Sequence, residues 1–159
     1  FMAGGGQETG LRSGTENLPA IVAMAKALRL AFEKHGAYPD HIAHLKAALV
    51  ESLQTFDGVH LFSKGDQFAP HILCFALAGI RGEVMVHALE EKQIFVSTTS
   101  ACSSKKAAVS STLRAMEVPK DLATSAVRIS LDDSNTMAEV EQFLIVFRQN
   151  YQRFTKVRN

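Results

Sequence analysis

Residues 70–79 read Pro-His-Ile-Leu-Cys-Phe-Ala-Leu-Ala-Gly, and the run from His71 to Leu77 within them decides the fold. A short apolar run bounded by Pro and Gly is typical of a buried strand rather than of a helix. Its apolar side chains fall on odd and even positions alike, so we expect both faces of this strand to be covered. The sequence therefore predicts a sheet with other elements packed on it.

Three further strand patterns flank this run. Val59–Phe62 precedes it across a polar turn, and Ile94–Val96 and Ala126–Leu131 follow it. The last of these alternates between apolar and polar residues, which places Arg128 on the less apolar face of the strand. The apolar face of the same strand consists of Val127, Ile129 and Leu131.

Helical spacing and capping residues predict the helices. Either Ser13-x-x-Glu16 or Asn17 caps the first helix, and the last helix begins with the capping box Thr136-x-x-Glu139. The expected helices span Asn17–Lys34, Pro39–Phe56, Gly82–Lys92, about Ser110–Met116 and a segment after Thr136, with a short turn at Pro119–Leu122. The first helix presents an apolar face made of Ile21, Met24, Ala25, Leu28 and Phe32.

These elements predict an α+β fold that two long helices precede. The chain has 159 residues, of which 47% are hydrophobic, and this suits one globular domain. We expect residues 1–159 to form that domain, with a glycine-rich loop at 1–16, helices at 17–57 and an α+β unit at 58–159.

Charge and composition exclude several classes of partner. The chain holds 17 Lys and Arg against 16 Asp and Glu, without a basic stripe, so nucleic acid is not an expected partner. No apolar run reaches the roughly 18 residues of a membrane span. The two cysteines lie far apart and form no CxxC pair, which suits a reducing, cytoplasmic location.

Cys102 is the strongest candidate for chemistry. It lies in Val-Ser-Thr-Thr-Ser-Ala-Cys-Ser-Ser-Lys, residues 96–105, a hydroxyl-rich stretch at the exit of a predicted strand, where a loop is expected. Such a loop is a poor place to pack a cysteine, whereas Cys74 lies in the apolar run and fits a buried thiol. From the residues alone, Cys102 is either a working nucleophile or an incidental thiol.

Residues 4–15 read Gly-Gly-Gly-Gln-Glu-Thr-Gly-Leu-Arg-Ser-Gly-Thr and hold five of the ten glycines. Glycine lets backbone N–H groups approach a ligand, and a loop that opens a helix offers an anion the positive end of the helix dipole. The spacing matches neither a Walker A loop nor GxGxxG. The loop is therefore either an anion-binding segment or a flexible connector.

His41 and His44 lie three residues apart on the second predicted helix, a spacing that two metal ligands can share. No third ligand lies nearby in the sequence, so no metal site is predicted.

Two motifs in this order resemble a known family. They are Gly-Gly-Gly-Gln-Glu with Leu-Arg-Ser-Gly-Thr-Glu-Asn-Leu-Pro at residues 4–19, and Val-Ser-Thr-Thr-Ser-Ala-Cys-Ser-Ser at residues 96–104. Together they resemble the C-terminal part of the NifS/IscS-type cysteine desulfurases, which are class V aminotransferases. Residues 126–131 and the Asn135-Thr136 pair are similar to that family's closing strand and helix. The resemblance covers essentially the whole chain.

The resemblance implies the small C-terminal domain of a fold type I, PLP-dependent transferase with a short, mostly antiparallel sheet, in a cytoplasmic homodimer. Family members convert L-cysteine to L-alanine and leave a persulfide on a cysteine. The sulfur then passes to an acceptor protein, such as an iron–sulfur scaffold or a tRNA thiolation enzyme. By motif match Cys102 is the catalytic cysteine, Arg128 binds the substrate carboxylate, and Thr15 binds the PLP phosphate across the dimer.

The sequence also departs from the family. The family's pyridoxal-binding lysine, and the histidine and aspartate that contact the ring, lie before the glycine-rich motif, and none of the nine lysines has that lysine's context. We therefore expect residues 1–159 to be a piece of a longer enzyme, inactive when alone. The alternative is a truncated homologue that serves as a sulfur carrier or a protein-interaction module. Smaller departures from the family are Thr9, where members often have arginine, and Thr98 and Thr99, where small Ser and Gly are usual. Asp132-Asp133 after the Arg128 strand is a further one.

Overall fold

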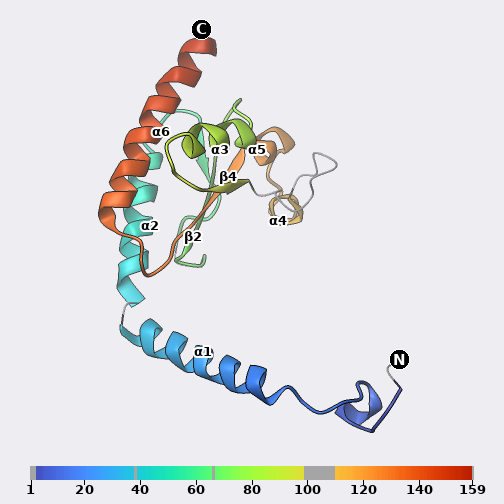
Figure 1. Ribbon diagram of the computed structural model, residues 1–159. Coiled ribbons are helices and arrows are strands. Elements are labelled where there is room, and N and C mark those ends of the chain that lie inside the picture. Colours follow the sequence, from blue (N-terminus) through green and yellow to red (C-terminus); the bar gives the residue numbers. More distant parts are fainter. Residues whose placement is uncertain (1–2, 38, 66, 99–109, 159) are drawn as a thin grey trace. The chain divides into compact units, whose positions relative to one another are not determined.

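The structure is a computed structural model that describes residues 3–37, 39–65, 67–98 and 110–158 (Figure 1). The chain divides into two compact units, Phe1–Pro39 and Asp40–Asn159. The expectation of one domain over the whole length stays a prediction, and each unit is described by itself below.

The first unit contains a single turn of 3-10 helix, η1 (Glu8–Gly10), and the long helix α1 (Leu18–Ala37). Of the two predicted caps, Asn17 is the one used, because its Oδ1 accepts a hydrogen bond of 3.1 Å from the Ala20 N–H. The apolar face predicted for this helix is present but exposed, with Ile21 at 46% and Phe32 at 69% of their full accessible area. In the described part of the first unit, no other element covers this face.

The second unit contains a four-stranded sheet in the order β1-β2-β4-β3. All three strand pairs are antiparallel, in agreement with the mostly antiparallel sheet that the family resemblance implied. The strands are β1 (Val59–Leu61), β2 (Ile72–Leu77), β3 (Ser97–Thr98) and β4 (Ala126–Ser130), and the helices are α2 (Pro39–Leu53), α3 (Gly82–Glu90), α4 (Ser111–Ala115), α5 (Lys120–Thr124) and α6 (Met137–Arg158). The predicted turn after Pro119 is the short helix α5.

The main core covers one face of the sheet, where α6 and α2 lie alongside each other against β2 and β4 (Figure 1). Phe147 of α6 packs edge to face against two other rings. Its ring centroid lies 5.6 Å from that of Phe75 on β2 and 5.2 Å from that of Phe56. The core is made of Leu45, Leu49, Leu53, Leu73, Phe75, Leu77, Met85, Leu89, Val127, Ile129, Val140, Phe143, Val146 and Phe147.

A second, smaller cluster covers part of the opposite face. Cys74 of β2 and Ala126 of β4 pack there against Leu113 of α4 and Ala123 of α5. Helices therefore lie against both faces of the central strand, and this confirms the prediction from the apolar run in residues 71–77.

The strand predicted at Ile94–Val96 is wrong by a few positions, because pairing with β4 begins at Ser97. Gln93 adopts a left-handed backbone conformation with φ 60°, and the Ile94 N–H donates to the Leu89 carbonyl at 3.1 Å. This Schellman motif ends α3 and uses the N–H that a strand would need for its ladder. Segment 94–96 therefore runs beside β4 without pairing to it.

The capping box predicted at the start of α6 is confirmed. The Thr136 N–H donates to the Glu139 carboxylate at 2.7 Å, and the Glu139 N–H donates to the Thr136 hydroxyl at 3.3 Å. The backbone hydrogen bond from Thr136, followed by the Asn135 side chain, lowers the pKa of Glu139.

This lowered pKa predicts a pH dependence of stability. The ionised Glu139 stabilises the folded chain above the ordinary carboxyl pKa of about 4.3, and that stabilisation disappears as the pH falls through the lower folded-state pKa. The difference in the free energy of unfolding between the natural chain and Glu139→Gln should therefore shrink between pH 6 and pH 3 in urea titrations. Glu141→Gln, an exposed neighbour on α6, is the control. A difference that is independent of pH would contradict the capping role.

Gly82, the first residue of α3, is expected to tolerate no side chain. A Cβ built there would lie 2.6 Å from the Ala126 carbonyl oxygen on β4, and a backbone atom cannot move away cheaply. Gly82→Ala should cost about 1–3 kcal/mol of unfolding free energy, the usual range for overpacking. Gly6→Ala, where a Cβ meets nothing within 4 Å, serves as the control in the same denaturation assay. Equal stability of the two variants would refute the close approach of α3 to β4.

Candidate functional site

Arg128 lies near the middle of β4 with its side chain exposed, while its neighbours Val127 and Ile129 are buried in the main core. The register places Cys74 of β2 opposite Arg128 on one side and Ser97 of β3 opposite it on the other. Residues that are directly opposite each other in an antiparallel sheet share a face. Arg128 therefore projects from the face away from the main core, between a thiol and a hydroxyl side chain.

Cys74 is a buried free thiol. Burial raises its pKa to about 11, although the nearby charge of Arg128 acts in the opposite direction. Its backbone is also tied down, because the Cys74 N–H donates to the Ser63 hydroxyl at 2.7 Å. A thiol with this pKa is almost entirely protonated near neutral pH, so Cys74 is unsuited to nucleophilic chemistry.

Cys102 lies outside the described residues, within 99–109. The described chain stops just before it at β3, whose Ser97 is the cross-strand neighbour of Arg128. The structure thus brings Arg128 beside the strand that leads into the Cys102 segment.

Thr15 belongs to the first unit, in the loop between η1 and α1. The loop is closed by its own contacts: Arg12 donates to the Gly14 carbonyl at 2.6 Å and pairs with Glu8 at 3.2 Å. The described hydrogen bonds of the loop use the side chains of Gln7, Glu8, Thr9, Arg12 and Ser13. Thr15 is exposed, and in the described part of the chain its hydroxyl takes no share in these bonds.

The loop's hydroxyl fits one part of a PLP site. An exposed threonine hydroxyl just before the first turn of a helix can donate to a phosphate oxygen. Lys46 is a poor fit to the rest of the cofactor. Lys46 is buried in the second unit, where desolvation lowers its pKa, and its Nζ donates to the Ala69 carbonyl at 2.9 Å. That bond holds the ammonium on the backbone between β1 and β2.

Of the two histidines considered as metal ligands, His44 is exposed and His41 has a backbone partner. The His41 Nε2 lies 2.7 Å from the Asn135 carbonyl oxygen, which ties α2 to the turn before α6. Among the residues that the structure describes, no group of three His, Cys, Asp or Glu side chains converges as metal ligands do.

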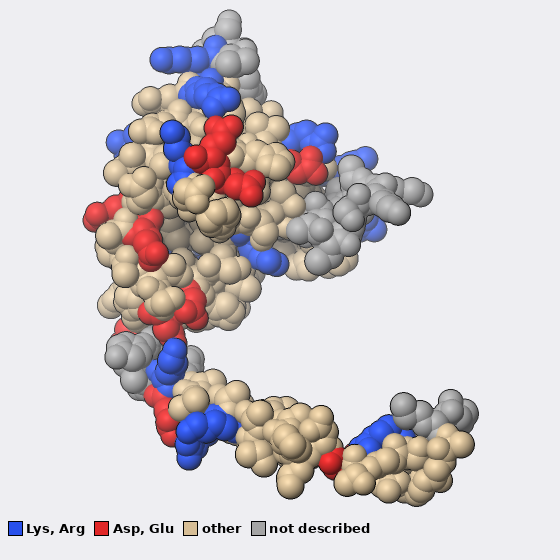
Figure 2. Space-filling view, viewed as in Figure 1, with Lys and Arg blue, Asp and Glu red and all other residues tan. Residues whose placement is uncertain are grey.

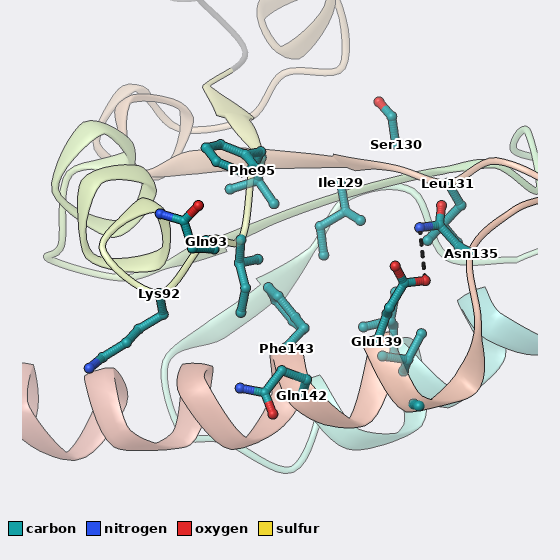
Figure 3. A pocket seen from close by; sticks show the side chains of 15 residues that line it. Lys92, Gln93, Phe95, Ile129, Ser130, Leu131, Asn135, Glu139, Gln142 and Phe143 are labelled. Atoms are coloured by element: carbon teal, nitrogen blue, oxygen red, sulfur yellow. Dashed lines mark hydrogen bonds between the residues drawn. The ribbon is translucent and has the colours of Figure 1, made fainter.

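A pocket that the sequence patterns did not predict lies next to the end of β4 (Figure 3). It has a volume of about 500 Å³ and is lined by segment 92–96, the end of β4 and the first turns of α6. Ile129, Ser130 and Phe143 contribute to its wall, and a 3.3 Å hydrogen bond joins Asn135 to Glu139 at its edge. The sequence carries no signal for it, because the helix end at Gln93 that displaces segment 94–96 is not marked by a glycine.

On the face drawn in Figure 2, acidic and basic side chains are interspersed over the second unit rather than gathered by sign. In the described part of the chain, no helix combines the length and the apolar character that a membrane span requires.

Comparison with known proteins gives consistent matches. Residues 4–143 match the family model described as aminotransferase class-V. The chain is 55% identical over 156 residues to a "NifS/IcsS protein homolog" of Lactobacillus delbrueckii subsp. bulgaricus, covering 97% of this chain and 40% of that protein. It is 33% identical over 150 residues to "Cysteine desulfurase IscS" of Buchnera aphidicola, covering 94% of this chain and 37% of the relative.

Solved structures of similar proteins agree with these matches. A "NifS-like protein" superposes with a TM-score of 0.73 at 33% identity, covering 98% of this chain and 38% of its own. A NifS-like protein from Rickettsia africae gives a TM-score of 0.78 at 27% identity, with 95% and 39% covered. The chain thus spans about 40% of the length of the curated relatives and structures it matches. These neighbours confirm the mixed α and β fold expected from the sequence.

The burial of Cys74 predicts selective protection from alkylation. At pH 8 a thiol with a pKa of about 11 is roughly one part in a thousand thiolate, and its side chain is also shielded from reagent. In the folded chain, iodoacetamide should leave Cys74 unmodified, whereas in urea it should react fully, as measured by peptide mass spectrometry. Rapid labelling of Cys74 in the folded chain at pH 8 would contradict its buried position.

Proposed function

Because this chain belongs to the class V aminotransferase family, we propose that it is the C-terminal part of a PLP-dependent cysteine desulfurase. The proposal takes support from relatives that are named NifS/IscS cysteine desulfurases. The substrate would be L-cysteine and the product L-alanine, with the sulfur retained on Cys102 as a persulfide. Since the chain spans about 40% of those relatives, this activity is proposed for the longer protein and not for residues 1–159 alone.

The observation that carries the proposal is the position of Arg128. Its exposed guanidinium stands on β4 at a position that is paired on both sides, beside the β3 residue that leads into the Cys102 segment. A guanidinium can hold a carboxylate through two parallel hydrogen bonds, and a strand within a sheet gives it a fixed base. Arg128 would bind the substrate carboxylate and so bring the sulfur within reach of Cys102.

Cys102 would act as the nucleophile. Its thiolate attacks the substrate sulfur, a sulfur–sulfur bond forms and the carbon–sulfur bond breaks, so that L-cysteine and a thiol become L-alanine and a persulfide. Of the two thiol protons, one stays on the persulfide and the other is taken up by the carbon that becomes the methyl group of L-alanine. Cys102 would need a pKa below the ordinary 8.5 of a thiol, in contrast to Cys74, whose pKa is raised.

Thr15 would hold the cofactor phosphate through its exposed hydroxyl, in the partner subunit of a homodimer. Bound PLP supplies an electron sink that makes the carbon–sulfur bond of the substrate breakable. The pyridoxal-binding lysine would come from outside residues 1–159, because in the family it precedes the glycine-rich motif and none of the nine lysines here has its sequence context. The persulfide would pass to a sulfur-acceptor protein, such as an iron–sulfur scaffold or a tRNA thiolation enzyme. A cytoplasmic location is part of the proposal, and the free thiol of Cys74 is consistent with it.

The two cysteines provide the test. In the longer protein that contains this chain, Cys102→Ser should abolish sulfide release from L-cysteine in the presence of a reducing thiol while PLP remains bound. Cys74→Ala should retain most of the activity, because a protonated, buried thiol takes no part in the reaction. Sulfide production and the visible absorbance of bound PLP are the two measurements.

Undiminished sulfide release by Cys102→Ser would refute the nucleophile. Residues 1–159 tested alone with PLP should release no sulfide. If residues 1–159 are instead the whole natural protein and accept sulfur from a persulfide donor, the sulfur-carrier alternative replaces the enzyme.

A further inference from the structure

The contacts of the loop between η1 and α1 converge on one side chain, Arg12. Its Nη1 donates to the Gly14 carbonyl oxygen at 2.6 Å. Its Nη2 lies 3.2 Å from a carboxylate oxygen of Glu8 and 3.9 Å from one of Glu16. One guanidinium therefore joins η1 to the residue before Thr15 and to the residue after it.

The bond to Gly14 bears directly on the direction of Thr15. The Gly14 carbonyl belongs to the planar peptide unit that continues through the nitrogen and Cα of Thr15. The Gly14 N–H also donates to the Gln7 Oε1 at 3.3 Å, so both backbone polar groups of Gly14 are held. Threonine is branched at Cβ and has few χ1 conformations. A fixed peptide unit before Thr15 therefore limits where its hydroxyl can lie.

Arg12 is itself poorly suited to bind an anion. Its one positive charge lies within 4 Å of two carboxylates, those of Glu8 and Glu16, so the three groups together carry a net charge of −1. A phosphate would gain little from a guanidinium that is already neutralised in this way. The exposed hydroxyl of Thr15 is the better contact for a phosphate, and Arg12 would act on the phosphate through it.

The ion pairs of Arg12 contribute little to global stability. The side chains of Arg12 and Glu8 keep 39% and 58% of their accessible area. Pairs as exposed as this one stabilise a folded chain by at most about 1 kcal/mol. Removal of Arg12 should therefore loosen the loop without unfolding the protein.

We propose that Arg12 is a positioning residue, which directs the Thr15 hydroxyl toward the cofactor phosphate without touching the phosphate. The inference rests on the proposed function, from which the phosphate role of Thr15 is taken. A guanidinium suits this task because its five N–H donors lie in a rigid planar fork and can hold several partners at once.

The binding test compares PLP with pyridoxal, which lacks the phosphate, in the longer protein after removal of its cofactor. Arg12→Ala should raise the Kd of PLP roughly three- to tenfold, because a hydrogen bond to a charged group is partly lost. The Kd of pyridoxal should stay within about twofold. Arg29→Ala, which removes an exposed arginine 3.5 Å from Glu33 on α1, is the matched control. Equal weakening of both ligands by Arg12→Ala, or of neither, would overturn the positioning role.

Thr15→Val separates this inference from the proposed function, because it removes the hydroxyl and keeps the shape of the side chain. It should weaken PLP at least as much as Arg12→Ala does, and the two changes together should weaken PLP no further than Thr15→Val alone. If Thr15→Val weakens PLP and Arg12→Ala does not, or if the two losses multiply, the role of Arg12 is overturned and the Thr15 contact stands. If Thr15→Val leaves the Kd of PLP unchanged, the phosphate role of Thr15 itself fails.

A double variant separates position from charge. Arg12→Ala combined with Glu8→Gln leaves the loop with the natural net charge of −1, carried by Glu16, but without the contacts of the guanidinium. Its Kd for PLP should stay as high as that of Arg12→Ala. Recovery of the natural Kd would show that Arg12 acts by its charge, and would contradict the positioning role.

A further readout needs no cofactor. The N–H groups of Leu11 and Gly14 are hydrogen-bonded within the loop, so hydrogen exchange reports how firmly the loop is held. In the cofactor-free longer protein, Arg12→Ala should speed exchange in peptides that cover residues 8–16 and leave the urea midpoint close to the natural value. Arg29→Ala should change neither. Natural exchange rates in the loop of Arg12→Ala would contradict the brace.

Discussion

The ladder between β2 and β4 is the constraint on which the rest of the structure depends. Five residue pairs, from Ile72 with Ser130 to Ala76 with Ala126, set the register of β4, and β3 pairs with its other edge. Because side chains alternate along a strand, a slip of one residue would turn Arg128 into the main core and expose Ile129. The cost of burying an unpaired guanidinium makes this register strongly preferred.

The same register gives the two cysteines different chemical surroundings. Cys74 is the cross-strand neighbour of Arg128, yet it packs against Leu113 and Ala123 in the smaller cluster, and burial raises its pKa. Proximity to a cation is therefore insufficient to activate a thiol that has been removed from water. We therefore propose a separate role for each residue: Arg128 binds an anion, Cys74 packs in the smaller cluster, and Cys102 supplies the reacting sulfur.

Much of the fold could be predicted because its signals are local. The alternation of residues 126–131 predicted the outward position of Arg128, and Thr136 with Glu139 predicted the start of α6 to the residue. The strand expected at 94–96 was displaced because a Schellman motif without glycine ends α3 there, and Gln93 gives no composition signal for it. The exposure of Phe95 and of the α1 face could not be predicted, since an apolar residue in sequence indicates a preference for burial and not the presence of a surface that covers it. Of the candidate site, the motifs supplied Thr15, Cys102 and Arg128, whereas the pocket follows from tertiary placement.

The central claim is that the sulfur of L-cysteine is transferred to Cys102. The most direct measurement is peptide mass spectrometry of the longer protein after incubation with PLP and L-cysteine without a reducing thiol, followed by trapping of persulfides by alkylation. The account predicts one added sulfur atom on the peptide that contains Cys102 and none on the peptide that contains Cys74. Added sulfur on Cys74, or L-alanine formed while Cys102 gains no sulfur, would contradict it.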